Sequence, residues 1–288
     1  VLLRADKIPD APAVFQLMLA RSLARQNRAD DAILRYQQYV TRAPADSVAW
    51  NELGSLFFAR KDYVKAISPL AMAVKYMPGN IESVRKLGVA YYETNRFDEA
   101  VGQLDNVVKA RKSDTEVIGL LARCHRSRKD TSDLIGTLRQ WFAVDAKNYD
   151  VALELGGLLV AKKTMDEAIV VLKSAVKLSD TDPRPYRFLA RAFEAQNNNK
   201  ERLGALRAVA DRAPRDPEAP FQLARYYLAK SQDAEAEPFL KSAIDLGPAH
   251  TAARYEYARL LLRANKPLPA YALLTEAAAL EPDNALIR

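Results

Sequence analysis

Side chains able to carry out catalysis are scarce in this sequence. It contains one cysteine, Cys124, and two histidines, His125 and His250. A nucleophilic pair would need a thiol and an imidazole directed at one another, but consecutive residues of a helix point in different directions. Cys124 and His125 are therefore a poor nucleophile–base pair, and we interpret His125 as a structural histidine with satisfied hydrogen bonds. His250, which follows Pro248 between two helical segments, is expected to be exposed.

The usual sequence signatures of catalysis and metal binding are also missing. We find no glycine-rich loop that could cradle a phosphate, no His-Glu-x-x-His motif, no nucleophile elbow and no metal-ligand spacing. Carboxylates stand at expected helix starts and on polar faces, where capping and solvation account for them. We therefore predict that the protein is not an enzyme and has no catalytic residue, no cofactor and no metal.

Arginines recur at a fixed spacing that suggests an anion-binding surface. Eight positions spaced 34 residues apart, beginning at residue 21, hold five arginines: Arg21, Arg123, Arg191, Arg225 and Arg259. The 26 arginines among 288 residues would place fewer than one there by chance. A guanidinium group donates two parallel hydrogen bonds to a carboxylate, so the series suits an acidic peptide, a C-terminal carboxylate or an acidic glycan. The alternative is that these arginines pair with nearby glutamates or are simply solvated.

Hydrophobic residues follow the same 34-residue spacing. A large residue recurs at Leu19, Leu53, Leu87, Leu121, Leu155, Leu189, Leu223 and Tyr257, and the residue after it is always glycine or alanine. A further series of small residues runs through Ala32, Ala66, Ala100, Ala168, Ala236 and Ala270. Apolar residues at steps of three and four predict two amphipathic helices in each repeat, divided by a polar turn such as residues 60–62.

The most regular copy of the repeat lies at residues 47–78. It reads W-x2-L-G-x2-F, followed by A-x3-L-x2-A and a closing proline. This pattern resembles the tetratricopeptide repeat, in the style of long bacterial repeat proteins. The resemblance implies an all-α fold, a right-handed α-α superhelix (solenoid) of about eight helix hairpins over residues 13–284. Residues 1–12 fit the tail of a preceding repeat and residues 285–288 the start of a further one, as in a segment of a longer protein.

In this family the first helix of each repeat lines a concave groove, which implies a function for the arginines. Their positions are expected to face the groove, with Arg187, Phe188, Phe221 and Tyr255 beside them. We predict a non-catalytic protein–protein interaction scaffold, part of a larger bacterial assembly, whose groove binds an acidic peptide or protein. One alternative is a periplasmic scaffold that binds an acidic exopolysaccharide during export, and another is the substrate-selecting repeat region of a longer enzyme. End-to-end self-association through uncovered terminal repeats is a further expectation.

Composition and charge limit the kinds of partner and the cellular location that we expect for this protein. The formal charge of +7 is modest for this length, and no nucleic-acid-binding module accompanies it, so we expect no nucleic acid partner. No apolar run approaches the roughly 18 residues of a membrane span, so direct membrane insertion is not expected. A single cysteine excludes an internal disulfide and does not indicate a compartment. The style of the turns favours a bacterial periplasmic or envelope-associated location, with the cytoplasm as the alternative.

Repeats four and six depart from the framework. Leu134 replaces the alanine of the second helix in repeat four, where Trp141 also occupies a small-residue position, and Arg202 replaces that alanine in repeat six. Bulky or charged residues at a helix contact should widen the hairpin or shift its second helix, so we expect local irregularity there. Asp98 and Asp166 are expected to cap the second helices of repeats three and five.

Overall fold

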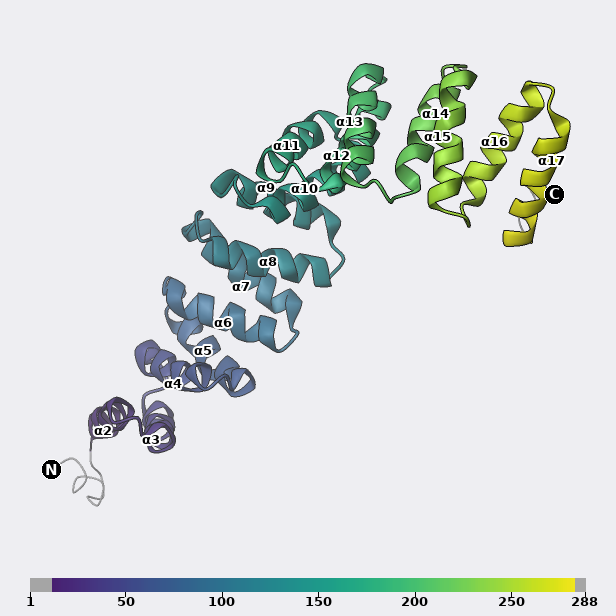
Figure 1. The fold of residues 1–288 in the computed structure, drawn as a ribbon. Coiled ribbons are helices and arrows are strands. Elements are labelled where there is room, and N and C mark those ends of the chain that lie inside the picture. Colours follow the sequence, from purple (N-terminus) through teal and green to yellow (C-terminus); the bar gives the residue numbers. More distant parts are fainter. Residues whose placement is uncertain (1–11, 283–288) are drawn as a thin grey trace. The chain divides into compact units, whose positions relative to one another are not determined.

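The computed structural model describes residues 12–282, which form sixteen α-helices and no β-strand (Figure 1). The helices are α2 (Ala13–Arg25), α3 (Ala29–Arg42), α4 (Ser47–Ala59), α5 (Tyr63–Tyr76), α6 (Ile81–Glu93), α7 (Phe97–Ala110), α8 (Thr115–Ser127), α9 (Thr131–Val144), α10 (Tyr149–Ala161), α11 (Met165–Leu178), α12 (Pro183–Ala195), α13 (Asn199–Arg212), α14 (Glu218–Leu228), α15 (Asp233–Leu246), α16 (Thr251–Arg263) and α17 (Pro267–Leu280). The predicted all-α fold is confirmed. The partial repeats predicted at residues 1–12 and 285–288 lie, apart from Pro12, outside the described residues.

Consecutive helices pair into eight hairpins, and the hairpins form two compact units. Helices α2–α9 belong to the unit that ends at Asp145, and α10–α17 belong to the unit that begins at Ala146. Within each unit the second helix of a hairpin packs against the first helix of the next, as α5 does on α6 and α11 on α12. This nearest-neighbour stacking is that of an α-solenoid. As far as residues 12–282 go, no helix is both long and apolar enough to cross a bilayer.

A residue with left-handed backbone conformation stands in the turn of every hairpin. These residues have φ between 54° and 63° and recur every 34 positions: Asn27, Lys61, Asn95, Lys129, Lys163, Asn197, Ser231 and Asn265. Positive φ lets the chain leave one helix and reverse within a three-residue turn, and asparagine tolerates it better than most residues. The unbroken spacing confirms the register of the predicted repeat.

Side-chain caps begin most of the first helices. The capping side chains that accept a hydrogen bond from a backbone N–H are Asp46, Asn80, Asp114, Asn148, Asp182 and His250. They lie 34 residues apart, with one repeat skipped at α14, whose N-cap residue is Pro217 and which has no side-chain cap. His250 therefore holds a structural position: its Nδ1 accepts from the N–H of Ala253 at 3.2 Å, and its side chain is only 14% exposed. The expectation that His250 is exposed was wrong.

The second helices of repeats three and five begin differently from the prediction. Arg96 and Thr164 occupy the N-cap positions of α7 and α11, and neither helix has a side-chain cap. Asp98 and Asp166 lie inside the first turn instead, where a negative charge still interacts favourably with the helix dipole. The predicted capping role was wrong, and the predicted electrostatic role fits the structure.

Close contact between the two helices of a hairpin forms the core. A Cβ atom added to Gly54, Gly88 or Gly156 would lie within 3 Å of a leucine side chain on the second helix of the same hairpin. The alanine series of the second helices is fully buried as well. Small residues on both helices therefore bring the backbones together, and the leucines fill the space that remains.

Repeat four accommodates its bulky residues by compensation. The Trp141 ring lies over Gly119, where its Cη2 atom would be 2.9 Å from an added Cβ. Leu134, in place of the usual alanine, is buried with 6% exposure. Even so, α8 and α9 pack together less than the two helices of any other described hairpin, as predicted for repeat four.

The first stability prediction concerns the large residue that recurs in the first helices. Leu53 is 2% exposed, so Leu53→Ala should lower the free energy of unfolding by about 2–5 kcal/mol. Val64, 72% exposed, provides the control, and Val64→Ala should change the stability by less than about 0.5 kcal/mol. Urea denaturation followed by circular dichroism measures both, and equal stabilities for the two variants would refute the core assignment.

A second stability prediction concerns the glycine contact. Gly156→Ala places a Cβ 2.4 Å from Leu172 Cδ2 and should destabilise the protein by about 1–3 kcal/mol through overpacking. Gly102 lies in the interior of α7 with nothing within 4 Å of an added Cβ. Gly102→Ala should therefore stabilise the protein by about 0.5–1 kcal/mol, since alanine favours the helix. The two changes should move the melting temperature in opposite directions, and shifts of the same sign would contradict this account.

Candidate partner-binding site

Three of the predicted arginines come together around one cavity of about 210 Å³ in the second unit. The cavity, which we call the arginine pocket, lies between α12, α13 and α14. Its lining residues are Arg187, Ala190, Arg191, Glu194, Arg202, Leu206, Val209, Glu218, Ala219, Gln222 and Arg225. Four arginines thus face two glutamates around a floor of aliphatic side chains.

Arg202, one of the lining residues, occupies the position of a buried alanine in most other repeats. Its side chain reaches both first helices: Nη2 pairs with Glu194 Oε1 at 2.9 Å, and the guanidinium lies 5.6 Å from the ring centre of Tyr226. Arg202 is only 8% exposed. Helices α12 and α13 pack together as closely as α10 and α11 do, so Arg202 does not widen its hairpin, contrary to the prediction.

The glutamates of the pocket already have partners. Glu194 is held by Arg202, and Glu218 accepts a hydrogen bond from Gln222 Nε2 while lying 3.4 Å from His250 Nε2. Arg187 is also engaged, because it pairs with Asp216 next to the pocket.

Arg191 and Arg225 have no such partner. They come from the same repeat position on α12 and α14, and both are exposed. Among the residues that the structure describes, neither guanidinium has a hydrogen-bond or ion-pair partner. Two uncompensated positive charges therefore border the same cavity.

The other arginines of the series do not join this pocket. Arg21 Nε donates to both carboxylate oxygens of Glu52 at 3.0 Å, and this hydrogen bonding raises the pKa of Arg21. Arg259 lies 3.3 Å from Glu256 and 5.7 Å from the ring centre of Tyr255. Arg259 therefore does not line the arginine pocket with Arg191 and Arg225. For Arg21 and Arg259 the glutamate-pairing alternative describes the structure.

Arg123 differs from both groups. It is exposed on α8, without an ion-pair partner in the described part of the chain, and it does not line the arginine pocket. It therefore matches Arg191 and Arg225 in exposure and repeat position, but not in surroundings.

The three predicted aromatic residues occupy three different environments. Phe188 is half-buried over Gly157 and lines a separate hollow with Leu153 and Leu158. Tyr255 is half-buried beneath Arg259. Phe221 is 7% exposed in the core, with its ring 4.7 Å from that of His250, so it cannot offer apolar surface beside the arginines. The prediction for Phe221 was wrong because His250, the N-cap residue of the next hairpin, covers its ring.

The residues considered for catalysis form no catalytic arrangement. Cys124 is fully buried, and burial raises the pKa of its thiol to about 11, which disfavours the nucleophilic thiolate. Burial also lowers the pKa of His125 and favours its neutral ring. Nδ1 of that ring is buried without a hydrogen-bond partner, so the interpretation of His125 as a satisfied structural histidine was wrong.

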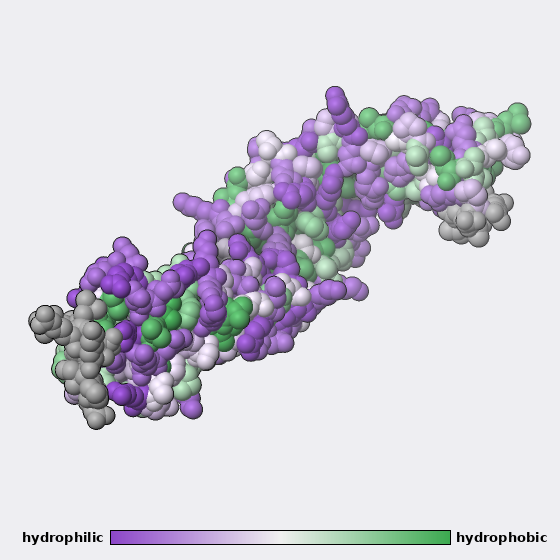
Figure 2. Space-filling view, turned by 90° about the horizontal axis from the view of Figure 1, so that it is seen from below, coloured by the Kyte–Doolittle hydropathy of each residue, from purple (hydrophilic) through white to green (hydrophobic). Residues whose placement is uncertain are grey.

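One face of the protein is mostly polar. The face seen in Figure 2 is mostly hydrophilic, with hydrophobic residues in small separate groups. Large patches of apolar surface are the usual mark of hydrophobic docking. On this face polar and charged side chains dominate.

Family models described as tetratricopeptide repeat match much of the chain. One matches residues 17–80 and 188–251, and another matches residues 57–124. Among characterised proteins, the BBSome complex member BBS4 homolog of Drosophila melanogaster is 29% identical over 104 residues, or 36% of this chain and 21% of that protein. Superkiller complex protein 3 of Homo sapiens is 26% identical over 94 residues, or 33% and 6%. The chain thus spans only a small part of either relative.

Solved structures share the fold at low sequence identity. The C-terminal part of a tetratricopeptide repeat-containing protein from Cytophaga hutchinsonii has a TM-score of 0.61 at 17% identity, covering 82% of this chain and 97% of that one. For YrrB the TM-score is 0.52 at 17% identity, with 64% and 95% covered, and for MamA it is 0.53 at 18%, with 56% and 95% covered. From the family models, the repeat register and these folds, we conclude that the chain belongs to the tetratricopeptide repeat family and is a repeat scaffold for protein–protein interaction.

Proposed function

We propose that this scaffold binds an acidic segment of a protein partner, and that the arginine pocket receives one or two of its carboxylates. The observation that carries the proposal is the pair of exposed arginines, Arg191 and Arg225, that border one cavity without acidic partners. The pocket is too small for a whole peptide but large enough for the end of an acidic side chain.

The chemistry of the pocket favours carboxylates over other groups. Guanidinium groups bind carboxylates through paired, charge-assisted hydrogen bonds, which are stronger than neutral ones. Positive charges gathered in a concave site raise the local concentration of anions and increase the rate of association. The aliphatic floor formed by Leu206 and Val209 would contact the methylene groups of a bound glutamate.

The built-in ion pairs support the same conclusion. Arg202 with Glu194 and Arg187 with Asp216 hold the walls, so a ligand need not compete with internal acids for Arg191 or Arg225. Preorganised donors lower the entropy lost on binding. The YrrB structure is described as that of a tetratricopeptide repeat protein with an unusual peptide-binding site, and peptide binding by this fold is consistent with the proposal.

Charge reversal in the pocket tests the proposal. The probe is a fluorescent peptide of glutamate pairs separated by leucines, compared with the same peptide carrying glutamines. We expect binding of the acidic peptide only, measured by fluorescence anisotropy, with affinity that falls as salt rises. Arg191→Glu and Arg225→Glu should each weaken binding by at least about tenfold, the equivalent of one lost charge-assisted hydrogen bond. Their circular dichroism should not change, since both side chains are exposed.

Arg123→Glu is the matched control. It makes the same charge change at the same repeat position but outside the pocket, so it should leave the affinity within about twofold of the wild type. Equal weakening by all three variants would indicate a general charge effect and refute a specific pocket. If an alginate oligosaccharide saturates the protein while the acidic peptide does not, the partner is an acidic polysaccharide and the peptide proposal is wrong.

A further inference from the structure

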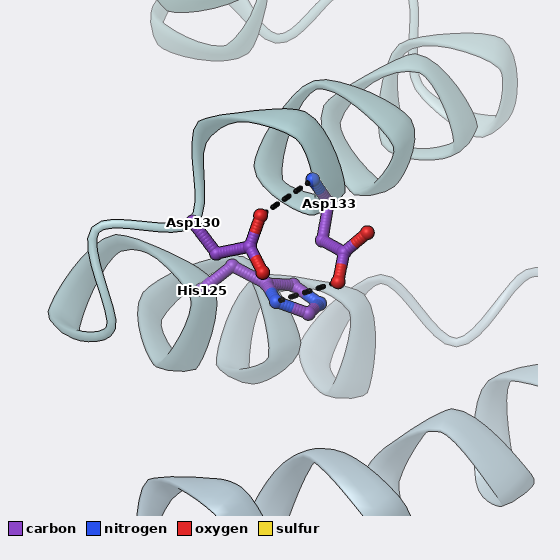
Figure 3. A group of neighbouring side chains, drawn as sticks. All are labelled: His125, Asp130 and Asp133. Atoms are coloured by element: carbon purple, nitrogen blue, oxygen red, sulfur yellow. Dashed lines mark hydrogen bonds and ion pairs between the residues drawn. The ribbon is translucent and has the colours of Figure 1, made fainter.

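Three potential metal ligands converge where α8 turns into α9. Figure 3 shows the imidazole of His125 and the carboxylates of Asp130 and Asp133 directed toward one another. One ligand atom from each lies within 4.8 Å of the other two. His125 belongs to the last turn of α8, Asp130 is the N-cap of α9, and Asp133 lies in the first turn of α9.

His125 is the anomaly in this cluster. The same position is filled by Leu23, Phe57, Tyr91, Leu159, Phe193, Tyr227 and Leu261 in the other repeats. The histidine is equally buried, with 5% exposure, but its Nδ1 has no hydrogen-bond partner among the described residues. Asp133 Oδ2 lies 4.0 Å away, beyond hydrogen-bonding distance. Burying a polar atom without a hydrogen-bond partner costs free energy. A ligand from outside the protein would remove that cost at this nitrogen.

The two carboxylates remain available to such a ligand. Asp130 Oδ1 accepts a hydrogen bond from the Asp133 N–H at 3.2 Å, which leaves its second oxygen free. Within residues 12–282 no lysine or arginine forms an ion pair with Asp130 or Asp133. The nearby Arg128 directs its Nε at Asp98 Oδ1 instead, 2.9 Å away. Two negative charges therefore face one unsatisfied imidazole nitrogen.

Helix capping accounts for only part of this arrangement. In repeat two, Asp62 caps α5 by accepting from the N–H of Lys65, just as Asp130 caps α9. That explains why Asp130 is there. An acid also stands at the position of Asp133 in most repeats, as Glu99 and Glu167 do, so Asp133 too has a role at the helix start. Neither role explains a histidine at a position that holds Phe57 in repeat two.

We propose that His125, Asp130 and Asp133 bind a divalent transition-metal ion of the zinc type. Imidazole suits zinc and similar ions, whereas magnesium and calcium prefer oxygen ligands alone. Zinc ligands stand about 2.0–2.2 Å from the ion, so tetrahedral ligand atoms would be about 3.4 Å apart. Asp133, with a side chain that is 61% exposed, can turn toward the ring to close the remaining distance.

The backbone around the cluster is already set for binding. The N–H of Asp130 donates to the carbonyl of His125 at 3.0 Å, and Lys129 takes the left-handed conformation common to all the hairpin turns. Binding of the ion would then require only rotation of the three ligand side chains. Three protein ligands leave a fourth tetrahedral position for water or for a side chain of a partner protein.

Zinc titration of the tag-free chain tests the site. The protein is stripped with a chelator, dialysed and titrated with ZnCl₂ in a calorimeter. We expect saturable binding of a single ion per chain at this site, with a higher melting temperature when zinc is bound. Bound Co²⁺ should give visible absorption bands of a low-symmetry site with nitrogen and oxygen ligands.

Variants locate the ion. His125→Phe restores a residue found at this position in repeats two and six, so it should fold but lose zinc binding. Asp130→Asn should weaken binding while keeping the helix, because asparagine caps the second helix α13 in the same way. Asp133→Asn should also weaken binding without unfolding the helix, because its side chain is exposed in the first turn. His250→Asn is the matched control and should bind as the wild type does. Wild-type protein that takes up no zinc, or binding that survives both His125→Phe and Asp133→Asn, would overturn the proposal.

Discussion

The structure depends on the close approach of two helices within each hairpin. That approach requires a residue without a long side chain at the contact, which is why Gly54, Gly88 and Gly156 lie directly beneath leucines of the partner helix. The contact is local in sequence, so every repeat can satisfy it independently. Stacking then needs only that the second helix of one hairpin present apolar surface to the first helix of the next. Each hairpin must connect to its neighbours with the same geometry. For that reason the turns share one backbone conformation and most first helices begin with a side-chain cap.

Where the framework is broken, the fold is retained and new surface chemistry results. The Trp141 ring fits because Gly119, which it covers, has no side chain. Arg202 is accommodated differently, since its charge needs a partner: it pairs with Glu194, and both residues line the arginine pocket. His125 replaces a hydrophobic residue and leaves a buried nitrogen beside two aspartates. In a repeat protein, departures from the consensus therefore mark the positions at which function can be added to the scaffold.

Charge neutralisation divides the arginine series into two kinds of residue. Arg21 and Arg259 lie next to glutamates and are held by them, so their charges serve the internal structure. Arg191 and Arg225 lie where the neighbouring acids are already engaged by other side chains, so no ion pair neutralises their charges. Identical residues at identical repeat positions thus differ in their charge partners because the acids around them differ.

The sequence by itself determined the helical fold, the 34-residue register and the core, since these follow from local periodicity and from small residues at fixed intervals. It also located the loosely packed hairpin of repeat four, through Leu134 and Trp141. Only the tertiary structure decided which arginines are paired, why Phe221 is buried, and that His125 meets Asp130 and Asp133. Ion pairing and burial depend on side chains from different helices, at separations of a few ångströms. Spacing along the chain specifies which helix faces a neighbour, but not which partner each side chain finds there.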